Sequence, residues 1–195
     1  MARKANGYML AEMLTTVAIL GILAAIALPA TFSRMRWMAM HTVAKRVRFL
    51  LLTVKSDAEA ANRNRAVRFS RLNGQWRYAI YEDGDGDGVR NDDIAAGRDT
   101  LVAGPYTFLD DSAGVTLGFP ASGVTHPDTN DRIDPESSPV NFNGSSLCSF
   151  SPNGDATPGT LYLTDGNQAA AVRSPGEGGN VYVLHYQASE RVWVP

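Results

Sequence analysis

The chain has 195 residues, enough for one membrane helix and one globular domain, and its 44% apolar and 9% aromatic content argues against wholesale disorder. Three scattered histidines and one cysteine, Cys148, argue against a zinc centre or a disulfide framework. The net charge of −2 is unevenly distributed: residues 8–71 carry a net charge of +7 and residues 72–195 a net charge of −11. The acidic C-terminal part would repel phosphate groups, which disfavours general nucleic-acid binding.

The first element is an apolar segment that follows a short basic leader. Residues 1–7 read as a processing segment, and residues 13–32 contain no formally charged side chain. Twenty residues of helix span about 30 Å, which is enough to cross the hydrocarbon core of a bilayer. We therefore predict a membrane-spanning part at about 8–32. Glu12 lies near its start, and an acid in such a segment indicates a functional role.

Two interpretations of this segment remain open on the residues alone. One is a retained membrane helix. The other is an ordinary secretory signal peptide, with Arg3 and Lys4 as its basic region and an A-x-A-like cleavage site at Ala25–Ala27. Glu12 and the apolar pattern that continues past this site argue against cleavage there.

The apolar segment continues into an amphipathic pattern, so that residues 8–64 are predicted to form one long helix. Pro29 lies inside this helix and is expected to kink or loosen it, because proline removes a backbone hydrogen bond. A stripe at spacings of three and four is predicted to pack on the remainder of the chain: Val43, Val47, Leu50, Val54, Ala58 and Ala61. The basic residues from Lys45 to Lys55 are expected to form a solvated helix face.

Residues 65–195 are predicted to form an antiparallel β domain, which we call the head. Alternating residues on both sides of Asn73-Gly74 predict a hairpin. Further strands are expected at 100–103, 105–109, 114–119, 147–150, 159–164, 168–173, 180–187 and 190–194. Residues 121–146 are rich in turn formers and are expected to form a long surface loop. No helical pattern is evident after residue 66. The predicted fold class is therefore α+β.

The most specific local motif of the head is DGDGDGVRNDDI, residues 83–94. Three carboxylates at alternate positions followed by a glycine match the first half of an EF-hand-like calcium loop. The predicted ligands are Asp83, Asp85, Asp87, the carbonyl of Val89, Asn91 and Asp93. The match then fails, because Ile94 stands where the closing acid should be. A solvated turn is the alternative, although closely spaced carboxylates repel one another unless they are screened.

The sequence offers no set of catalytic residues, and we do not predict an enzyme. His185 has no nucleophile elbow or other catalytic signature near it and is expected to be a strand residue. Arg191 and Trp193 are candidates for contact with a partner, and the alternative is that they flank a closing edge strand.

The spacing of Gly7, Tyr8, Glu12 and Pro29 resembles the class III signal peptide of type IV pilins and type II secretion pseudopilins. In those families a prepilin peptidase cuts after the glycine and methylates the new amino terminus. The glutamate stands fifth in the mature chain and a proline often twenty-second, as here. The resemblance implies cleavage between Gly7 and Tyr8, and pairing of Glu12 with the amino terminus of a neighbouring subunit. It also implies a single-pass inner-membrane precursor with a periplasmic head.

The head is similar to the GspH/FimT group of minor pilins and pseudopilins. FSPNGDATPGTLYL resembles its F-x-x-x-G…G-T-L-x-L region, and HYQASERVWVP resembles its closing strand. The resemblance implies a structural subunit of a type II secretion pseudopilus or a type IV pilus, with other pilins as partners and no required cofactor. Two alternatives stay open: an exported or membrane-tethered calcium-binding β domain, and a DNA-binding minor pilin. The acidic head disfavours the second.

Overall fold

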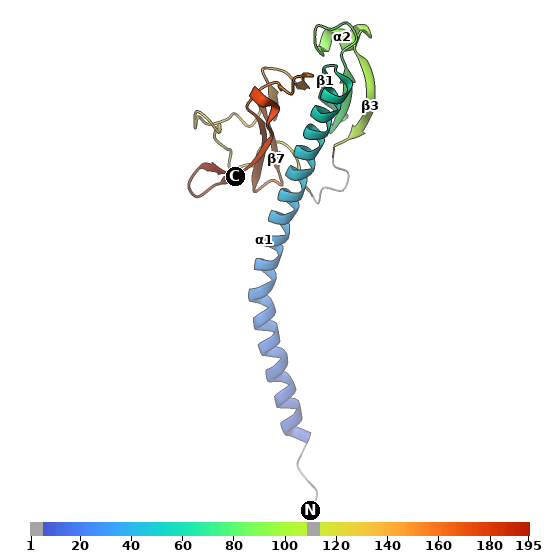
Figure 1. Cartoon of the computed structure of the whole chain (residues 1–195). Helices are drawn as coiled ribbons and strands as arrows, with labels where there is room; N and C mark the ends of the chain where they lie inside the picture. The colour runs from blue at the N-terminus through green and yellow to red at the C-terminus, as the bar shows by residue number, and fades with distance from the viewer. Residues whose placement is uncertain (1–5, 109–113) are drawn as a thin grey trace, which may run out of the picture. The chain divides into compact units, whose positions relative to one another are not determined.

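The structure is a computed structural model that describes the backbone of residues 6–108 and 114–195, and side chains except those at 6–9, 29, 30, 32 and 33. It divides into two compact units, Met1–Met38 and Ala39–Pro195, which we call the N-terminal unit and the head unit. The order of elements is one long helix followed by antiparallel strands (Figure 1). This order confirms the predicted α+β fold class.

The long helix α1 spans Asn6–Ala61 and continues through position 29 without interruption. Its first part is rich in strong helix formers, and the described large apolar side chains between Leu10 and Leu28 are exposed. The helix ends at Ala61, three residues earlier than predicted. Asn62 follows in the left-handed region at φ 52°, and the Arg63 N–H donates to the Ala58 carbonyl.

The second part of α1 supplies one side of the core of the head unit. Its buried residues are Met40, Val43, Ala44, Val47, Leu51, Val54 and Ala58. The predicted stripe is correct for four of its six positions. Leu51 rather than Leu50 is fully buried, Leu50 packs at the margin of the core, and Ala61 is exposed. Because a helix has 3.6 residues per turn, spacings of three and four do not decide which of two adjacent residues at the margin of a stripe is buried.

The first sheet has four strands in the order β3-β2-β1-β6, with every neighbouring pair antiparallel. The strands are β1 Arg65–Leu72, β2 Gln75–Glu82, β3 Thr100–Thr107 and β6 Leu147–Phe150. Asn73 and Gly74 form the two-residue turn between β1 and β2 with φ of 50° and 80°, as the Asn-Gly pair predicts. The two strands expected at 100–103 and 105–109 form the single strand β3, with register irregularities against β2.

The second sheet runs in the order β10-β9-β8-β7-β4, and β5 also pairs with β7. Its strands are β4 Thr116–Leu117, β5 Val140–Phe142, β7 Gly159–Thr164, β8 Ala169–Ser174, β9 Tyr182–Gln187 and β10 Val192–Val194. A 3-10 turn, η1, covers Glu177–Gly179 between β8 and β9. All of these pairings are antiparallel.

The prediction of a surface loop over 121–146 was wrong at its C-terminal end, where β5 lies. Val140 and Phe142 alternate inward and are buried, and Val124 is buried as well. The Asn143-Gly144 turn then joins β5 to β6, with two backbone hydrogen bonds between Phe142 and Ser145 of 2.8 and 3.0 Å. Three residues are too few for an alternating pattern to be recognised, although the Asn-Gly signal was present.

One continuous apolar core joins α1 to both sheets of the head unit. The core includes Val67 and Phe69 of β1, Cys148 and Phe150 of β6, and Leu161 and Leu163 of β7, all packed with the buried face of α1. Cys148 is 0% exposed, and burial raises the pKa of its thiol, so that it serves as a small apolar residue.

Candidate functional site

Glu12 lies in the first turns of α1, at the start of an apolar stretch that is long enough to cross a membrane. That stretch covers Leu10–Leu28, 19 residues. The hydroxyl groups of Thr15 and Thr16 donate to the Glu12 carbonyl at 2.9 and 2.7 Å, which satisfies both hydroxyls within the helix. The exposed carboxylate of Glu12 is the single formal charge of the stretch. It is therefore the one charged group of the stretch, and a charge in such a segment favours a functional role.

The other predicted processing and assembly residues fall on the same helix. Gly7, Tyr8 and Pro29 lie within the backbone bounds of α1. The side chains at positions 8 and 29 lie outside the described part of the structure, so their predicted roles stay predictions.

The acidic loop between β2 and β3 brings together three of its six predicted calcium ligands. Carboxylate oxygens of Asp83, Asp85 and Asp87 lie within 4.8 Å of one another. Asp83 is buried and accepts hydrogen bonds from the backbone N–H groups of Asp85, Gly86 and Gly88, and from the Asn64 side chain at 2.7 Å. Burial raises the pKa of the Asp83 carboxyl, but these donors outweigh it and leave that pKa below its usual value.

The two other predicted side-chain ligands, Asn91 and Asp93, make contacts outside this group of three carboxylates. The Asn91 side chain donates to Ser145 Oγ at 3.4 Å. The Val89 side chain is buried in a small cluster with Ala66 and Leu147, and its backbone carbonyl stays a predicted ligand. Asp93 is buried and forms an ion pair with Arg98. Asn91 and Asp93 belong to a short helix that the sequence pattern does not predict, and Val89 lies two residues before it.

That helix is α2, Asn91–Ala96. Two local signals mark it: the acidic residues Asp92 and Asp93 in its first turn, and Gly97, which caps it in the left-handed conformation at φ 73°. Six residues are too few to show helical periodicity, so the sequence pattern predicts a loop at this position. Asp99 closes the loop by accepting from the backbone N–H groups of Gly84 and Arg90.

Position 84 of this loop requires glycine, because another backbone segment lies very close to it. A β-carbon at Gly84 would lie 2.0 Å from the Arg98 carbonyl oxygen, which is far inside van der Waals contact. Arg98 Nε also lies 3.5 Å from Asp85 Oδ2, and Arg90 Nη1 lies 2.5 Å from Asp87 Oδ2. Calcium would have to compete with these two guanidinium groups for the exposed carboxylates.

Calcium binding by Asp83, Asp85 and Asp87 stays a prediction with a direct thermal test. For the full-length chain in detergent, we expect calcium at ten times its Kd to raise the free energy of unfolding by about 1.4 kcal/mol, seen as a higher Tm. Asp87→Asn should remove the increase, and Asp131→Asn in an exposed loop should retain it. A Tm that does not change with calcium would show that the loop is a turn stabilised by its own hydrogen bonds and does not bind calcium.

Two histidines that are 144 positions apart meet between α1 and β9. His41 Nδ1 lies 2.8 Å from His185 Nε2, with ring centroids 4.9 Å apart. His185 is half-buried in β9, as expected of a strand residue. Burial lowers the pKa of His185, and the positive charges of His41 and Lys45 lower it further. Nothing in the local sequence indicates this contact, because neither histidine lies in a motif.

The lowered pKa of His185 predicts that acid weakens the head unit. The unfolded chain binds a proton at His185 near pH 6.5, whereas the folded chain does so only at lower pH. The contribution of neutral His185 to the free energy of unfolding is therefore fully present above about pH 6.5. Below that pH the free energy of unfolding falls by at most about 1.4 kcal/mol per pH unit. We expect urea unfolding between pH 7 and 5.5 to show this slope. His185→Gln should flatten it, and His126→Gln should not.

Two basic side chains of α1 that were expected to be solvated bind the loop after β8. Arg48 Nε donates to the Val181 carbonyl at 2.6 Å, and Lys55 Nζ donates to the Gly178 carbonyl at 2.9 Å. A β-carbon at Gly179 would lie 2.0 Å from the Gly154 carbonyl, so only glycine fits beneath Lys55. The prediction that all basic residues from Lys45 to Lys55 are solvated was wrong at these two positions. The spacing of residues along a helix does not show which distant loop packs on it.

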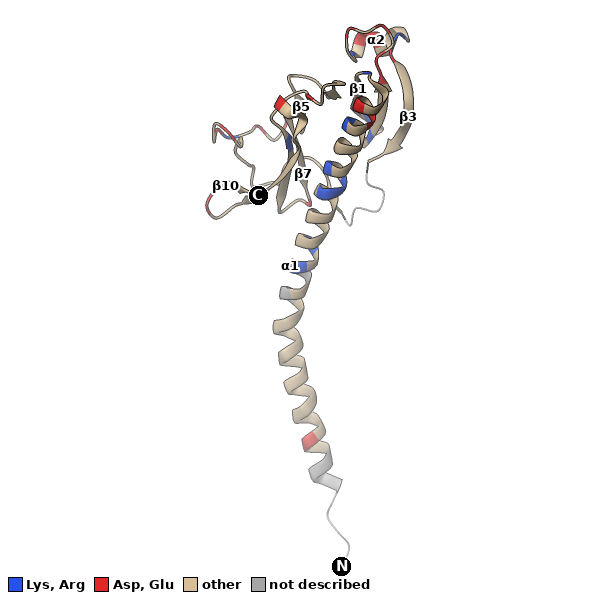
Figure 2. Cartoon of the chain, viewed as in Figure 1, with Lys and Arg blue, Asp and Glu red and all other residues tan. Residues whose placement is uncertain are grey.

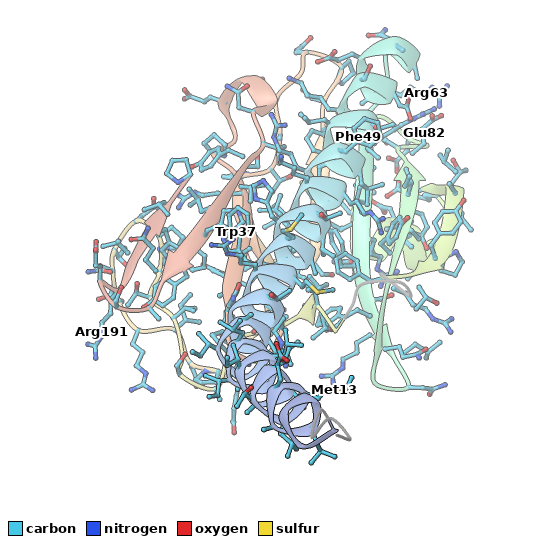
Figure 3. All side chains as sticks on the ribbon, turned by 90° about the horizontal axis from the view of Figure 1, so that it is seen from below. Met13, Trp37, Phe49, Arg63, Glu82 and Arg191 are labelled. Carbon is cyan, nitrogen blue, oxygen red and sulfur yellow. The ribbon has the colours of Figure 1, made fainter. Side chains whose placement is uncertain are left out.

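The two predicted contact residues near the C-terminus differ in their surroundings. Trp193 is half-buried, donates from Nε1 to the Thr125 carbonyl at 2.7 Å, and packs against Tyr162 and Tyr186. Its ring therefore serves the fold of its own chain. Arg191 is exposed at φ 56° in the turn before the edge strand β10 (Figure 3), and lines a cavity of about 120 Å³ with Arg132 and Tyr186. Its role as a partner contact stays a prediction.

Comparison with protein families gives a match that covers most of the head unit. A family model described as type II transport protein GspH matches residues 48–174, from the second part of α1 to the end of β8. Comparisons with curated proteins and with solved structures gave no match.

Proposed function

The chain belongs to the GspH family of type II transport proteins, and on that premise we propose that it is a pseudopilin cut and N-methylated by a prepilin peptidase. The family consists of structural pilin-like subunits that associate in a pseudopilus, not of enzymes. The apolar helix near the N-terminus fits a single-pass membrane anchor. A match to a type II transport family favours a secretion pseudopilus over a type IV or DNA-uptake pilus.

The observation that carries this proposal is the acid in the apolar stretch. Glu12 is the single charge between Leu10 and Leu28, and it stands five positions after Gly7. Cleavage between Gly7 and Tyr8 would create an amino terminus, and an α-amino group with a pKa near 8 is cationic at neutral pH. An amine on a neighbouring helix is therefore a fitting partner for the Glu12 carboxylate.

Pairing between Glu12 and that amine would set the register of one helix against the next. In apolar surroundings an unpaired charge is strongly unfavourable, so a helix that slips along its neighbour loses the pair and exposes both charges to a low dielectric. Before assembly, the same helix would hold the precursor in the inner membrane, with the head in the periplasm. Five basic residues follow the apolar stretch against two, Arg3 and Lys4, before it, and by charge alone they favour the opposite orientation: Arg34, Arg36, Lys45, Arg46 and Arg48. Processing by a peptidase that acts on the cytoplasmic leader requires the orientation we propose.

Blocking the cleavage site tests the proposal. We expect Gly7→Val to accumulate as the full precursor in cells that contain a prepilin peptidase, because a branched side chain at this position does not fit a site selective for glycine. The measurement is the shift between precursor and mature bands on a gel. Asn6→Ala is the matched control and should be cut normally. Equal processing of both variants would refute the proposal that the peptidase recognises Gly7 at the cleavage site.

A further inference from the structure

The face of the second sheet that points away from α1 forms the floor of a cavity. Side chains alternate along each strand, so Leu161 of β7 and Val172 of β8 pack in the core with α1, and their neighbours point the other way. Asn141, Thr160 and Arg173 are paired in register on β5, β7 and β8 and therefore share this outer face. We call the space above them the outer cavity. Its volume is about 390 Å³.

A long loop and a pair of aromatic rings line the rest of the outer cavity. The loop over 121–138 lies on the side of the sheet opposite α1 (Figure 1), and it contributes His126 and Asp128 to the lining. Phe119 supplies an apolar wall, and its ring packs on that of Tyr162 with 5.1 Å between the ring centroids. The outer cavity therefore combines polar groups with a flat apolar surface, and its size is that of a site for a small molecule.

The charges that line the outer cavity are balanced. Arg173, whose side chain is 16% exposed, forms an ion pair with Asp128. The hydrogen bond from Arg173 lowers the pKa of the Asp128 carboxyl, so this group stays ionised. An anionic ligand would meet the carboxylate, and a cationic ligand would meet the guanidinium. Residues 126–136 also hold four acids against one arginine (Figure 2), which further disfavours an anion.

The polar groups of the outer cavity have hydrogen-bonding capacity that the chain does not use. Within the described part of the chain, Arg173 makes one hydrogen bond, to Asp128, and its Nε is buried without a partner. Asn141 Oδ1 accepts from the Gly144 N–H at 2.9 Å, which leaves the Nδ2 group of Asn141 able to donate. His126 Nδ1 accepts from the Asp128 N–H at 3.2 Å, so the proton of the neutral ring lies on Nε2 and can be donated as well.

These groups fit a ligand that carries no net charge, both donates and accepts hydrogen bonds, and has an apolar side. Hydroxyl groups donate and accept, and a pyranose ring presents C–H groups on its faces and hydroxyl groups around its edge. We propose that the outer cavity binds a neutral sugar, with a C–H face on Phe119 and hydroxyl groups bonded to Asp128 and Arg173. This site goes beyond the proposed function, because it gives the head unit a ligand and does not depend on cleavage after Gly7.

Titration of two neutral disaccharides into the full-length chain tests this site. The chain is kept in a polyoxyethylene detergent, because the headgroups of glucoside and maltoside detergents would compete for the outer cavity. We expect saturable binding of cellobiose or of N,N′-diacetylchitobiose in isothermal titration calorimetry, and the tighter of the two distinguishes a plain hexose from an acetamido sugar. Absence of binding by both disaccharides, or tighter binding of inorganic phosphate than of either, would overturn the proposal.

Matched variants then test whether the sugar lies in the outer cavity. Asp128→Asn should raise the Kd about tenfold, because a carboxylate accepts stronger hydrogen bonds than an amide does. Asp131→Asn makes the same change of charge on the same loop, but Asp131 is exposed and does not line the outer cavity, so this variant should bind like the unmodified chain. Equal Kd values for the two variants would refute the site.

Arg173→Met provides a second variant on the floor of the outer cavity. It should raise the Kd at least tenfold, because it removes the guanidinium donors. Since the Arg173 side chain is largely buried, the Tm of this variant is measured in parallel. The Asp128 side chain is 55% exposed, so Asp128→Asn keeps the test decisive if Arg173→Met unfolds. A folded Arg173→Met chain that binds the sugar with an unchanged Kd would contradict the proposal.

Discussion

A chain with Glu12→Ala is expected to be cut and methylated normally but to be almost absent from assembled pseudopili. Removing one partner of an ion pair in apolar surroundings costs about 3–5 kcal/mol, because the other charge stays buried and unpaired. That cost corresponds to more than a hundredfold loss of incorporation. The measurement compares the amount of the chain in sheared filaments with the amount in the membrane fraction.

The matched controls for Glu12 separate charge from shape. Glu12→Gln keeps the size of the side chain and should be nearly as defective as alanine, because the charge is lost. Thr16→Val removes a hydroxyl that bonds only the Glu12 carbonyl within the helix, and should assemble normally. Normal incorporation of Glu12→Ala would refute the pairing role.

Phe142→Ala is expected to destabilise the head unit by about 3–5 kcal/mol, the usual cost of deleting a large aromatic side chain from a core. Phe142 is 0% exposed and packs in the main core from the short strand β5. Since a domain of this kind is stable by about 5–15 kcal/mol, the loss is a large share of the total. Urea unfolding of the full-length chain in detergent, followed by tryptophan fluorescence, gives the change in midpoint.

Leu72→Ala is the control for Phe142. Leu72 lies on β1 and is 49% exposed, so its truncation should change the free energy of unfolding by about 0.5 kcal/mol or less. Similar midpoints for Phe142→Ala and the unmodified chain would mean that residues 140–142 are not part of the core, as the loop prediction had it.

Long, strongly patterned elements were predictable from the sequence, because their signals are local. The apolar run and the stripe of α1 extend over many turns, and the Asn73-Gly74 pair both marks the first hairpin and sets its register. Short elements were not predictable. The strand β5 and the helix α2 span three and six residues, too few for a period to repeat, and the surrounding core decides their conformation.

Contacts between distant segments were also beyond sequence reasoning. The pair His41–His185 joins residues 144 positions apart, and Arg48 and Lys55 bind carbonyl groups of a loop more than a hundred residues away. The acidic motif shows a similar restriction at short range. Its regular Asp spacing predicts six ligands for one cation. The fold brings the carboxylates of Asp83, Asp85 and Asp87 together, whereas the Asp93 carboxylate pairs with Arg98. Spacing along the chain does not say which way each side chain turns.

Mass spectrometry of the mature amino terminus tests the central claim most directly. Our account predicts that the chain purified from membranes of a host with a prepilin peptidase begins at Tyr8 and carries one methyl group on its α-amino nitrogen. A chain that begins at Leu28, after the A-x-A-like site, would show an ordinary secretory signal peptide, and it would contradict both the pilin-like processing and the role we give to Glu12.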